Sequence, residues 1–111
     1  MATINNLLID QGTTFSIVVN MTNPDGTAKD LTNYTPTAHI RKSYYTNTYT
    51  AFTAVKTDVT GGVITLSLTA TQTSTLKAGR YVYDLEVVSI ADSETLRVIE
   101  GIVTVTPEAT K

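Results

Sequence analysis

Few side chains in this sequence could do chemistry, and the first to consider is the single histidine. His39 stands between Ala38 and Ile40 in an alternating segment, so its ring is expected on the outward, exposed side of a strand. A zinc site needs several nitrogen or sulfur ligands, and the chain has no cysteine and no acidic cluster near His39. We therefore assign no metal-binding or catalytic role to this histidine.

Paired carboxylates offer a second route to acid–base chemistry. Asp84 and Glu86 are two residues apart in an alternating segment, which places them about 7 Å apart on one strand face. A flat outward face provides no cleft, so we expect arginine or lysine partners on a neighbouring strand. Asp25, Asp30 and Asp58 lie in separate turns, where aspartate commonly accepts local hydrogen bonds. Their spacing is not that of an EF-hand, although calcium binding at a turn stays open.

Glycine-containing motifs of enzymes are also missing. Gly61 and Gly62 precede a strand pattern rather than a helix, and no Gly-Lys-Ser or Gly-Lys-Thr follows them. The chain also has no Gly-x-Ser-x-Gly nucleophile elbow. We expect no enzymatic activity, no cofactor and no small-molecule substrate.

A polar and aromatic segment remains as the candidate binding site. It contains Tyr44, Tyr45 and Tyr49, with Arg41 and Lys42 beside them. Tyrosine and arginine are favoured at interface hot spots, and tyrosines on a loop also suit stacking against sugars. Alternatively, one or two of these rings simply cover the end of the fold. We assign Arg41, Tyr44, Tyr45 and Tyr49 as candidate partner contacts.

The composition fits one small domain over residues 1–111. A net charge of −2 argues against a nucleic-acid partner, which would call for a basic face. Charged residues are only 16% of the chain, and threonine makes up about a fifth, far above its ordinary share. No segment reads as a secretory signal, and none approaches the ~18 apolar residues of a membrane helix. We expect assembly in a cytoplasm and no membrane partner.

Alternating hydrophobicity with a period of two dominates the chain and predicts strands. The clearest segments are 15–21, 63–68, 81–88 and 95–106, and weaker ones are 3–9, 36–41 and 48–56. Segment 30–34 looks like a short edge, and in 48–56 either face could be buried. Thr69 and Gln72 have capping-box spacing, so at most one short helical turn is expected near 69–76. Gly101 inside the last strand predicts a bulge or a close backbone contact.

The segment around Tyr81 narrows the fold. Immunoglobulin-like sandwiches often enter one strand through a corner, at which a tyrosine hydroxyl bonds to the backbone just upstream. Tyr81 follows Gly79 by two residues and precedes Tyr83 by two, and Tyr83 stands where an antibody domain would carry its second cysteine. An ordinary strand start is the alternative. The sequence therefore predicts an all-β, immunoglobulin-like sandwich of about 7–8 antiparallel strands, with Gly79 and Tyr81 at its corner.

Several runs, in the same order along the chain, resemble the N-terminal domain family of phage baseplate upper proteins and stand-alone virion proteins of similar size. They are GTTF at 12–15, DLTNYT at 30–35, GVITL at 62–66, AGRYVYDLE at 78–86 and EGIVTVTPE at 100–108. The resemblance implies an immunoglobulin-like sandwich that docks into a virion substructure. It carries over no catalytic residues.

The resemblance makes a structural role in a tailed-phage virion the leading expectation. In the baseplate proteins this domain anchors a longer receptor-binding chain, whereas here no stalk follows, which favours a tail, baseplate or collar adaptor or a head decoration. Other virion proteins and copies of the same chain are the expected partners, reached through segments 2–9 and 106–111. The alternative is a host-surface binding module, adhesin-like or carbohydrate-binding, that uses the 41–49 loop.

Overall fold

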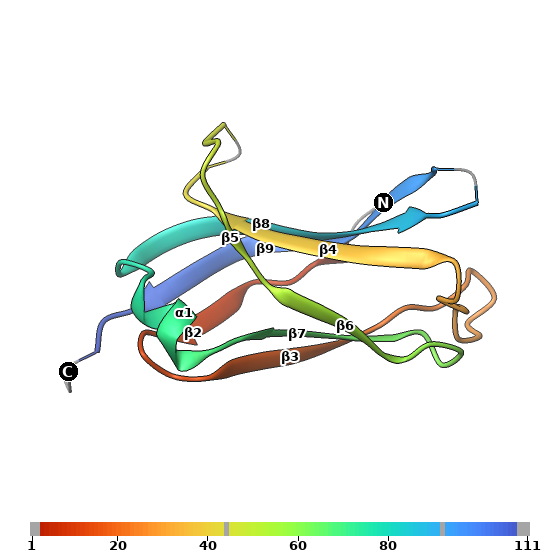
Figure 1. Ribbon diagram of the computed structural model, residues 1–111, viewed down its shortest axis with the longest axis horizontal. Helices are drawn as coiled ribbons and strands as arrows, with labels where there is room; N and C mark the ends of the chain where they lie inside the picture. The colour runs from red at the N-terminus through yellow and green to blue at the C-terminus, as the bar shows by residue number, and fades with distance from the viewer. Residues whose placement is uncertain (1–2, 44, 92, 109–111) are drawn as a thin grey trace.

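Two β-sheets, packed face to face, make up the molecule (Figure 1). The computed structural model describes residues 3–43, 45–91 and 93–108. Its strands are β1 Thr3–Ile4, β2 Leu7–Asp10, β3 Phe15–Asn20, β4 Tyr34–Arg41, β5 Thr50–Ala51, β6 Thr53–Asp58, β7 Val63–Leu68, β8 Gly79–Ser89 and β9 Thr95–Thr106. One short helix, α1 Ala70–Ser74, connects β7 to β8.

Sheet A is the larger layer and has the strand order β1-β9-β8-β4-β5, with β2 also paired to β9. Sheet B has the order β3-β7-β6. The predicted sandwich is confirmed, but the expectation of purely antiparallel strands is wrong at the N-terminus. Both β1 and β2 run parallel to β9, because the N-terminal segment enters sheet A beside the last strand of the chain.

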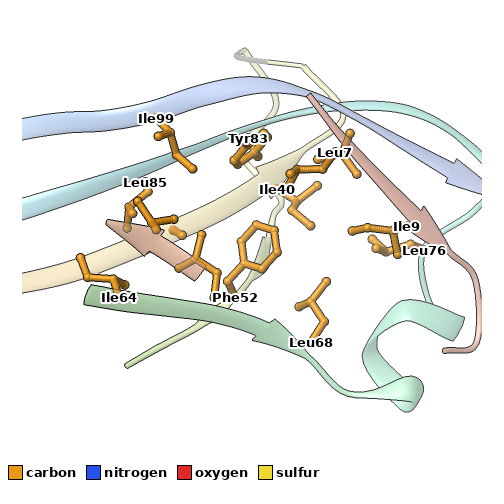
Figure 2. Packing of buried hydrophobic residues seen from close by; sticks show 14 of the residues in the cluster. Leu7, Ile9, Ile40, Phe52, Ile64, Leu68, Leu76, Tyr83, Leu85 and Ile99 are labelled. Carbon is orange, nitrogen blue, oxygen red and sulfur yellow. The ribbon is translucent and has the colours of Figure 1, made fainter. Parts of the chain in front are cut away.

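The core lies between the inward faces of the two sheets, as the alternation predicts. Figure 2 shows side chains from both sheets meeting in this space, with the Phe52 ring among them. The ring of Phe52 lies 6.1 Å from that of Tyr83 and 6.3 Å from that of Phe15, measured between centroids. The remaining buried hydrophobic residues are Leu7, Ile9, Val19, Leu31, Ala38, Ile40, Ile64, Leu66, Leu68, Leu76, Leu85, Val87, Ile99, Val103 and Val105.

The segment expected as one strand over 48–56 is divided between the two sheets. β5 pairs with β4 in sheet A, and β6 pairs with β7 in sheet B. Phe52 stands between them and is only 6% exposed, so the chain crosses from one layer to the other where this ring enters the core. The structure thereby decides the ambiguous register in favour of the face that carries Phe52. Segment 30–34 differs as well, because it forms a turn that buries Leu31 before β4 begins at Tyr34.

The N-terminal segment is part of the sandwich rather than a free arm. Leu7 and Ile9 point into the core, and Ile9 is fully buried. Between β1 and β2, the carbonyl of Asn5 accepts a hydrogen bond from the Tyr83 hydroxyl. A Cβ on Gly101 would come within 2.5 Å of that same carbonyl oxygen, which confirms the predicted close backbone contact. Residues 3–4 and 7–10 thus pair with β9 of the same chain, and contact of segment 2–9 with a neighbouring protein stays a prediction.

The predicted corner is present where β8 begins. The Tyr81 hydroxyl donates to the backbone carbonyl of Lys77 at 2.7 Å. Gly79 has a φ of +144°, a conformation that side-chain-bearing residues rarely adopt. The bond lies at the surface and not in the core. The expected helical turn is confirmed too, with Thr69 and Gln72 forming a reciprocal capping box at the start of α1.

Candidate functional site

The aromatic candidates of the 41–49 segment are held above the outward face of sheet A. β4 ends at Arg41, and the loop that follows stands out from the sandwich before β5 begins (Figure 1). The Tyr49 ring stacks on His39 with a centroid distance of 3.8 Å and an interplanar angle of 15°. The Arg41 guanidinium lies 4.9 Å from the same ring centroid. We call these three residues the Tyr49 stack.

The stack brings together two of the candidate contacts, Arg41 and Tyr49, and corrects the expected exposure of His39. His39 points outward as predicted, but it is half-buried because Tyr49 covers it. Arg41 also donates from Nη1 to the carbonyl of Thr46 at 2.6 Å, so its side chain links the end of β4 to the loop that follows. A cation over an aromatic face typically contributes about 0.5–1 kcal/mol at an exposed site.

Tyr45 is placed apart from the stack. It is 95% exposed at the outer part of the loop, whereas Tyr49 is 53% exposed. Its neighbour Tyr44, the fourth candidate, lies outside the described residues. Tyr45 is therefore the described ring that the loop presents most openly to a partner.

An arginine-centred cluster lies beside the stack on sheet A. Arg97 of β9 reaches Asp84 at 3.5 Å, Glu86 at 3.9 Å and Glu100 at 3.1 Å, which confirms the expected cross-strand partner of the two carboxylates. The hydrogen bond with Glu100 is the main reason that the pKa of Arg97 is raised. A shallow depression of about 370 Å³ connects this cluster to His39 and Arg41.

The turn aspartates act locally, as expected. The Asp25 carboxylate accepts from the backbone and hydroxyl of Thr27, and Asp30 accepts in the same way from Thr32. These hydrogen bonds lower the pKa of both carboxyl groups. Among the residues described, no three His, Cys, Asp or Glu side chains gather as metal ligands would.

The outward face of sheet B is a surface that sequence reasoning did not locate. We call it the neutral face, because nine of its ten outward side chains carry no charge. The uncharged residues are Ser16, Val18, Asn20, Thr53, Val55, Thr57, Val63, Thr65 and Ser67. The tenth is Asp58, which pairs with Val63 after the bulge at the end of β6. Val18 and Val55 are 60% and 52% exposed and lie on either side of Thr65.

The two outward faces therefore differ in the kind of polar group that they carry. Sheet A carries the exposed or half-exposed charges of Arg41, Arg80, Asp84, Glu86 and Arg97. Sheet B carries hydroxyl, amide and aliphatic groups, with the single carboxylate of Asp58 at the end of β6. The composition shows a low overall charge. In the sequence, the outward positions of segment 63–68 are all uncharged. Which other segments share that face depended on the sheet order.

No protein-family model matches the sequence, and no curated protein matches it. Solved structures do resemble it in three dimensions. The NK cell receptor NKp44, described as a triggering partner in natural cytotoxicity, gives a TM-score of 0.51 at 12% identity, over 96% of this chain and 99% of that one. The fold is immunoglobulin-like.

A second similar structure is InlP of Listeria monocytogenes. It gives a TM-score of 0.49 at 16% identity, and the match covers 92% of this chain but only 26% of InlP. At such identities a structural match shows the fold alone. Within the described residues, no helix has the length and hydropathy needed to span a membrane.

Proposed function

We propose that this chain is a non-enzymatic structural component of a bacteriophage virion, acting through protein–protein contacts in a tail, baseplate or collar, or as a head decoration. The observation that supports this role best is the neutral face of sheet B. A face with a single charge, at its end, loses little solvation free energy when another protein covers the rest of it, since burying an unpaired charge costs several kcal/mol. Interface cores are likewise depleted in charged side chains.

The sequence resemblance supplies the virion context for this proposal. Three of the runs that resemble phage baseplate N-terminal domains lie largely in β7, β8 and β9, and the other two end at the starts of β3 and β4, so the runs reach both sheets. The resemblance thus concerns the whole sandwich rather than one motif. Surface polarity and sequence resemblance are independent observations, and both favour a part built into a larger assembly.

Particle composition tests the proposal directly. Purified phage particles encoding this chain should contain it at a fixed ratio to the major capsid protein, measured by quantitative mass spectrometry. The ratio also separates a tail ring from a head decoration, because the copy numbers differ widely. A protein that stays soluble and is absent from washed particles would contradict the proposal.

A second candidate function is binding to a host surface through the 41–49 loop. It is favoured by the 95% exposure of Tyr45 and by the depression beside the Tyr49 stack, which offers carboxylates and an arginine close to an aromatic platform. Aromatic rings and paired polar groups are what a sugar ligand would use.

Glycan-array binding distinguishes the second candidate from the first. If the loop binds a sugar, Tyr45→Ala should abolish the array signal, while the control Val55→Ala, at an exposed position on the other sheet, should keep it. Wild-type protein that binds no glycan and no host cell would exclude this candidate and leave the structural role standing.

A further inference from the structure

We propose that the free edge of β3 pairs with β3 of a second copy, antiparallel and centred on Val18, so that two copies share one continuous six-stranded sheet. This inference makes the proposed function more specific. It rests on that function only because both require protein–protein contact. It names the partner, a second copy of this chain, and the strand that receives it. Strand addition at a sheet edge is a common mode of protein recognition.

One side of β3 offers unpaired backbone groups. Throughout the described residues β3 pairs only with β7. The Met21 amide, directly after the strand, donates to Gly62 on the β7 side. Because peptide groups alternate along an antiparallel strand, Ser16, Val18 and Asn20 direct their N–H and C=O groups toward the free side.

The core is incompletely covered along this same edge. Phe15 and Ile17 point inward from β3 but remain partly exposed, whereas their partners on β7, Leu68 and Leu66, are at most 1% exposed. Met21 at the end of the strand is partly exposed as well. A further strand beside β3 would cover all three side chains. This is the stabilisation that an edge-to-edge contact would gain from the hydrophobic effect.

Among the strands of the described residues, every other sheet edge carries a feature that discourages pairing, whereas β3 does not. β1 and β5 have two residues each, and β2 has four and ends in Asp10. β6 carries Lys56 and Asp58 with a bulge between them. Pro36 occupies the half of β4 that β5 does not cover. Short strands, charges, bulges and prolines are the means by which proteins protect exposed edges.

β3 is a six-residue strand with the sequence Phe-Ser-Ile-Val-Val-Asn, so it contains no charge and no proline. A two-fold axis through Val18 would therefore bring no like charges together. It would set Val18 against Val18 and Ser16 against Asn20 on the outward face. On the inward face, Ile17 would meet Val19, and Phe15 would meet Met21.

The Asn20 end of the edge also has room for this pairing. A hollow of about 720 Å³ lies there, lined by Asn20 and Met21 on one side and by Leu96 and Val98 of β9 on the other. In the centred register this is where Phe15 of the second copy approaches Met21. The hollow therefore lies beside the largest inward side chain that the pairing brings in.

Sedimentation velocity over a concentration series tests the pairing. The wild-type protein should form a dimer. Val18→Lys and Val18→Glu should each weaken dimerisation by about tenfold or more, because like charges face each other at the axis. An equimolar mixture of the two variants should recover the dimer. The control Val55→Lys, on the same face but on the opposite edge strand, should dimerise like the wild type.

Several results would overturn the proposal. These are a wild-type protein that stays monomeric at every concentration, a dimer that neither Val18 variant weakens, and a mixture that does not recover. Equal weakening by Val55→Lys would instead point to face-on packing. Position 18 is 60% exposed, so both variants should fold, with a wild-type circular dichroism spectrum and a cooperative melt. A protein that is monomeric in solution but present in phage particles would contradict only the proposed dimer. A dimer that is absent from particles would contradict only the proposed virion role.

Discussion

At the scale of single residues, two tyrosines on β8 do different work although they stand two positions apart. Tyr81 bonds to the carbonyl of Lys77, four residues upstream, and fixes the corner before the strand. Tyr83 is 1% exposed and bonds to the carbonyl of Asn5, 78 residues away in sequence. The first contact is local and the second holds the N-terminal segment on sheet A.

Replacing Tyr81 by phenylalanine removes the corner hydrogen bond while keeping the ring. We expect the free energy of unfolding to fall by about 1 kcal/mol, the usual net value of one such bond. Urea denaturation followed by circular dichroism measures it. Tyr45→Phe is the matched control, because Tyr45 is 95% exposed, and it should change stability by less than ~0.5 kcal/mol. Equal urea midpoints for the wild type, Tyr81→Phe and Tyr45→Phe would show that the corner hydrogen bond does not contribute to stability.

Tyr83 should make the fold sensitive to alkaline pH. Burial raises the pKa of Tyr83 to about 12, above the value of about 10 expected in the unfolded chain. Stability from this group is therefore complete below about pH 10 and is lost as the pH rises toward 12. Between about pH 9 and pH 11 the wild type should lose more stability than Tyr83→Phe, in urea titrations at both values. Parallel losses in the two proteins would contradict the assignment.

At the scale of elements, α1 connects the two sheets and is not an independently stable helix. It has five residues, too few for a helix to be stable by itself. Its Thr73 is fully buried, and the hydroxyl donates to the carbonyl of Thr13 at 2.7 Å in the connection between β2 and β3. The helical turn thus ties the entry of β8 to the start of β3.

Thr73→Val keeps the shape of the side chain but removes this donor. The variant should lose about 1–2 kcal/mol of stability, because the Thr13 carbonyl is left without its partner. Thr71→Val, at an exposed position of the same helix, is the control and should cost far less. Thermal melts of both variants check the difference. Indistinguishable melts would mean that α1 does not join the two regions energetically.

Gly101 tests how the N-terminal segment is seated on β9. It is the register partner of Tyr83, so the two residues flank the Asn5 carbonyl from neighbouring strands. Gly101→Ala places a methyl group 2.5 Å from that oxygen, and the backbone of residues 4–6 must move. We expect faster amide hydrogen exchange in β1 and β2 and a lower melting temperature. Unchanged exchange there would show that the segment adapts without losing its pairing.

At the scale of the whole molecule, the sandwich depends on strands from both ends of the chain. β2 supplies Leu7 and Ile9 to the core and pairs in parallel with β9. Removing two large buried side chains typically costs about 2–5 kcal/mol each, against a total stability of about 5–15 kcal/mol for a domain. We therefore expect the N-terminal strands to be required for folding.

Deleting residues 1–10 should accordingly give a chain without a cooperative thermal transition, measured by circular dichroism and by one-dimensional NMR. Leu8→Ala is the control for the same strand, because Leu8 is 62% exposed, and it should retain a normal transition. A truncated protein that still unfolds cooperatively near the wild-type temperature would show that the N-terminal strands are not needed for folding.

The sequence by itself determined the local features of this protein. The long strands β3, β7, β8 and β9, the capping box at Thr69 and the corner at Tyr81 each depend on spacing within a few residues. Alternation also assigned the outward positions of His39 and Asp84 correctly. These features are local because period-two burial and short-range hydrogen bonds leave their pattern within one segment.

Only the tertiary structure decided the features that join distant segments. The parallel pairing of β2 with β9, the crossing at Phe52 and the bond from Tyr83 to Asn5 all depend on which strands become neighbours. Strand order also gathers the outward positions of β3, β6 and β7, all but Asp58 uncharged, on one face and leaves the β3 edge unpaired. Each strand carries the same alternation whatever its neighbour, so the pattern within a segment does not specify its partner.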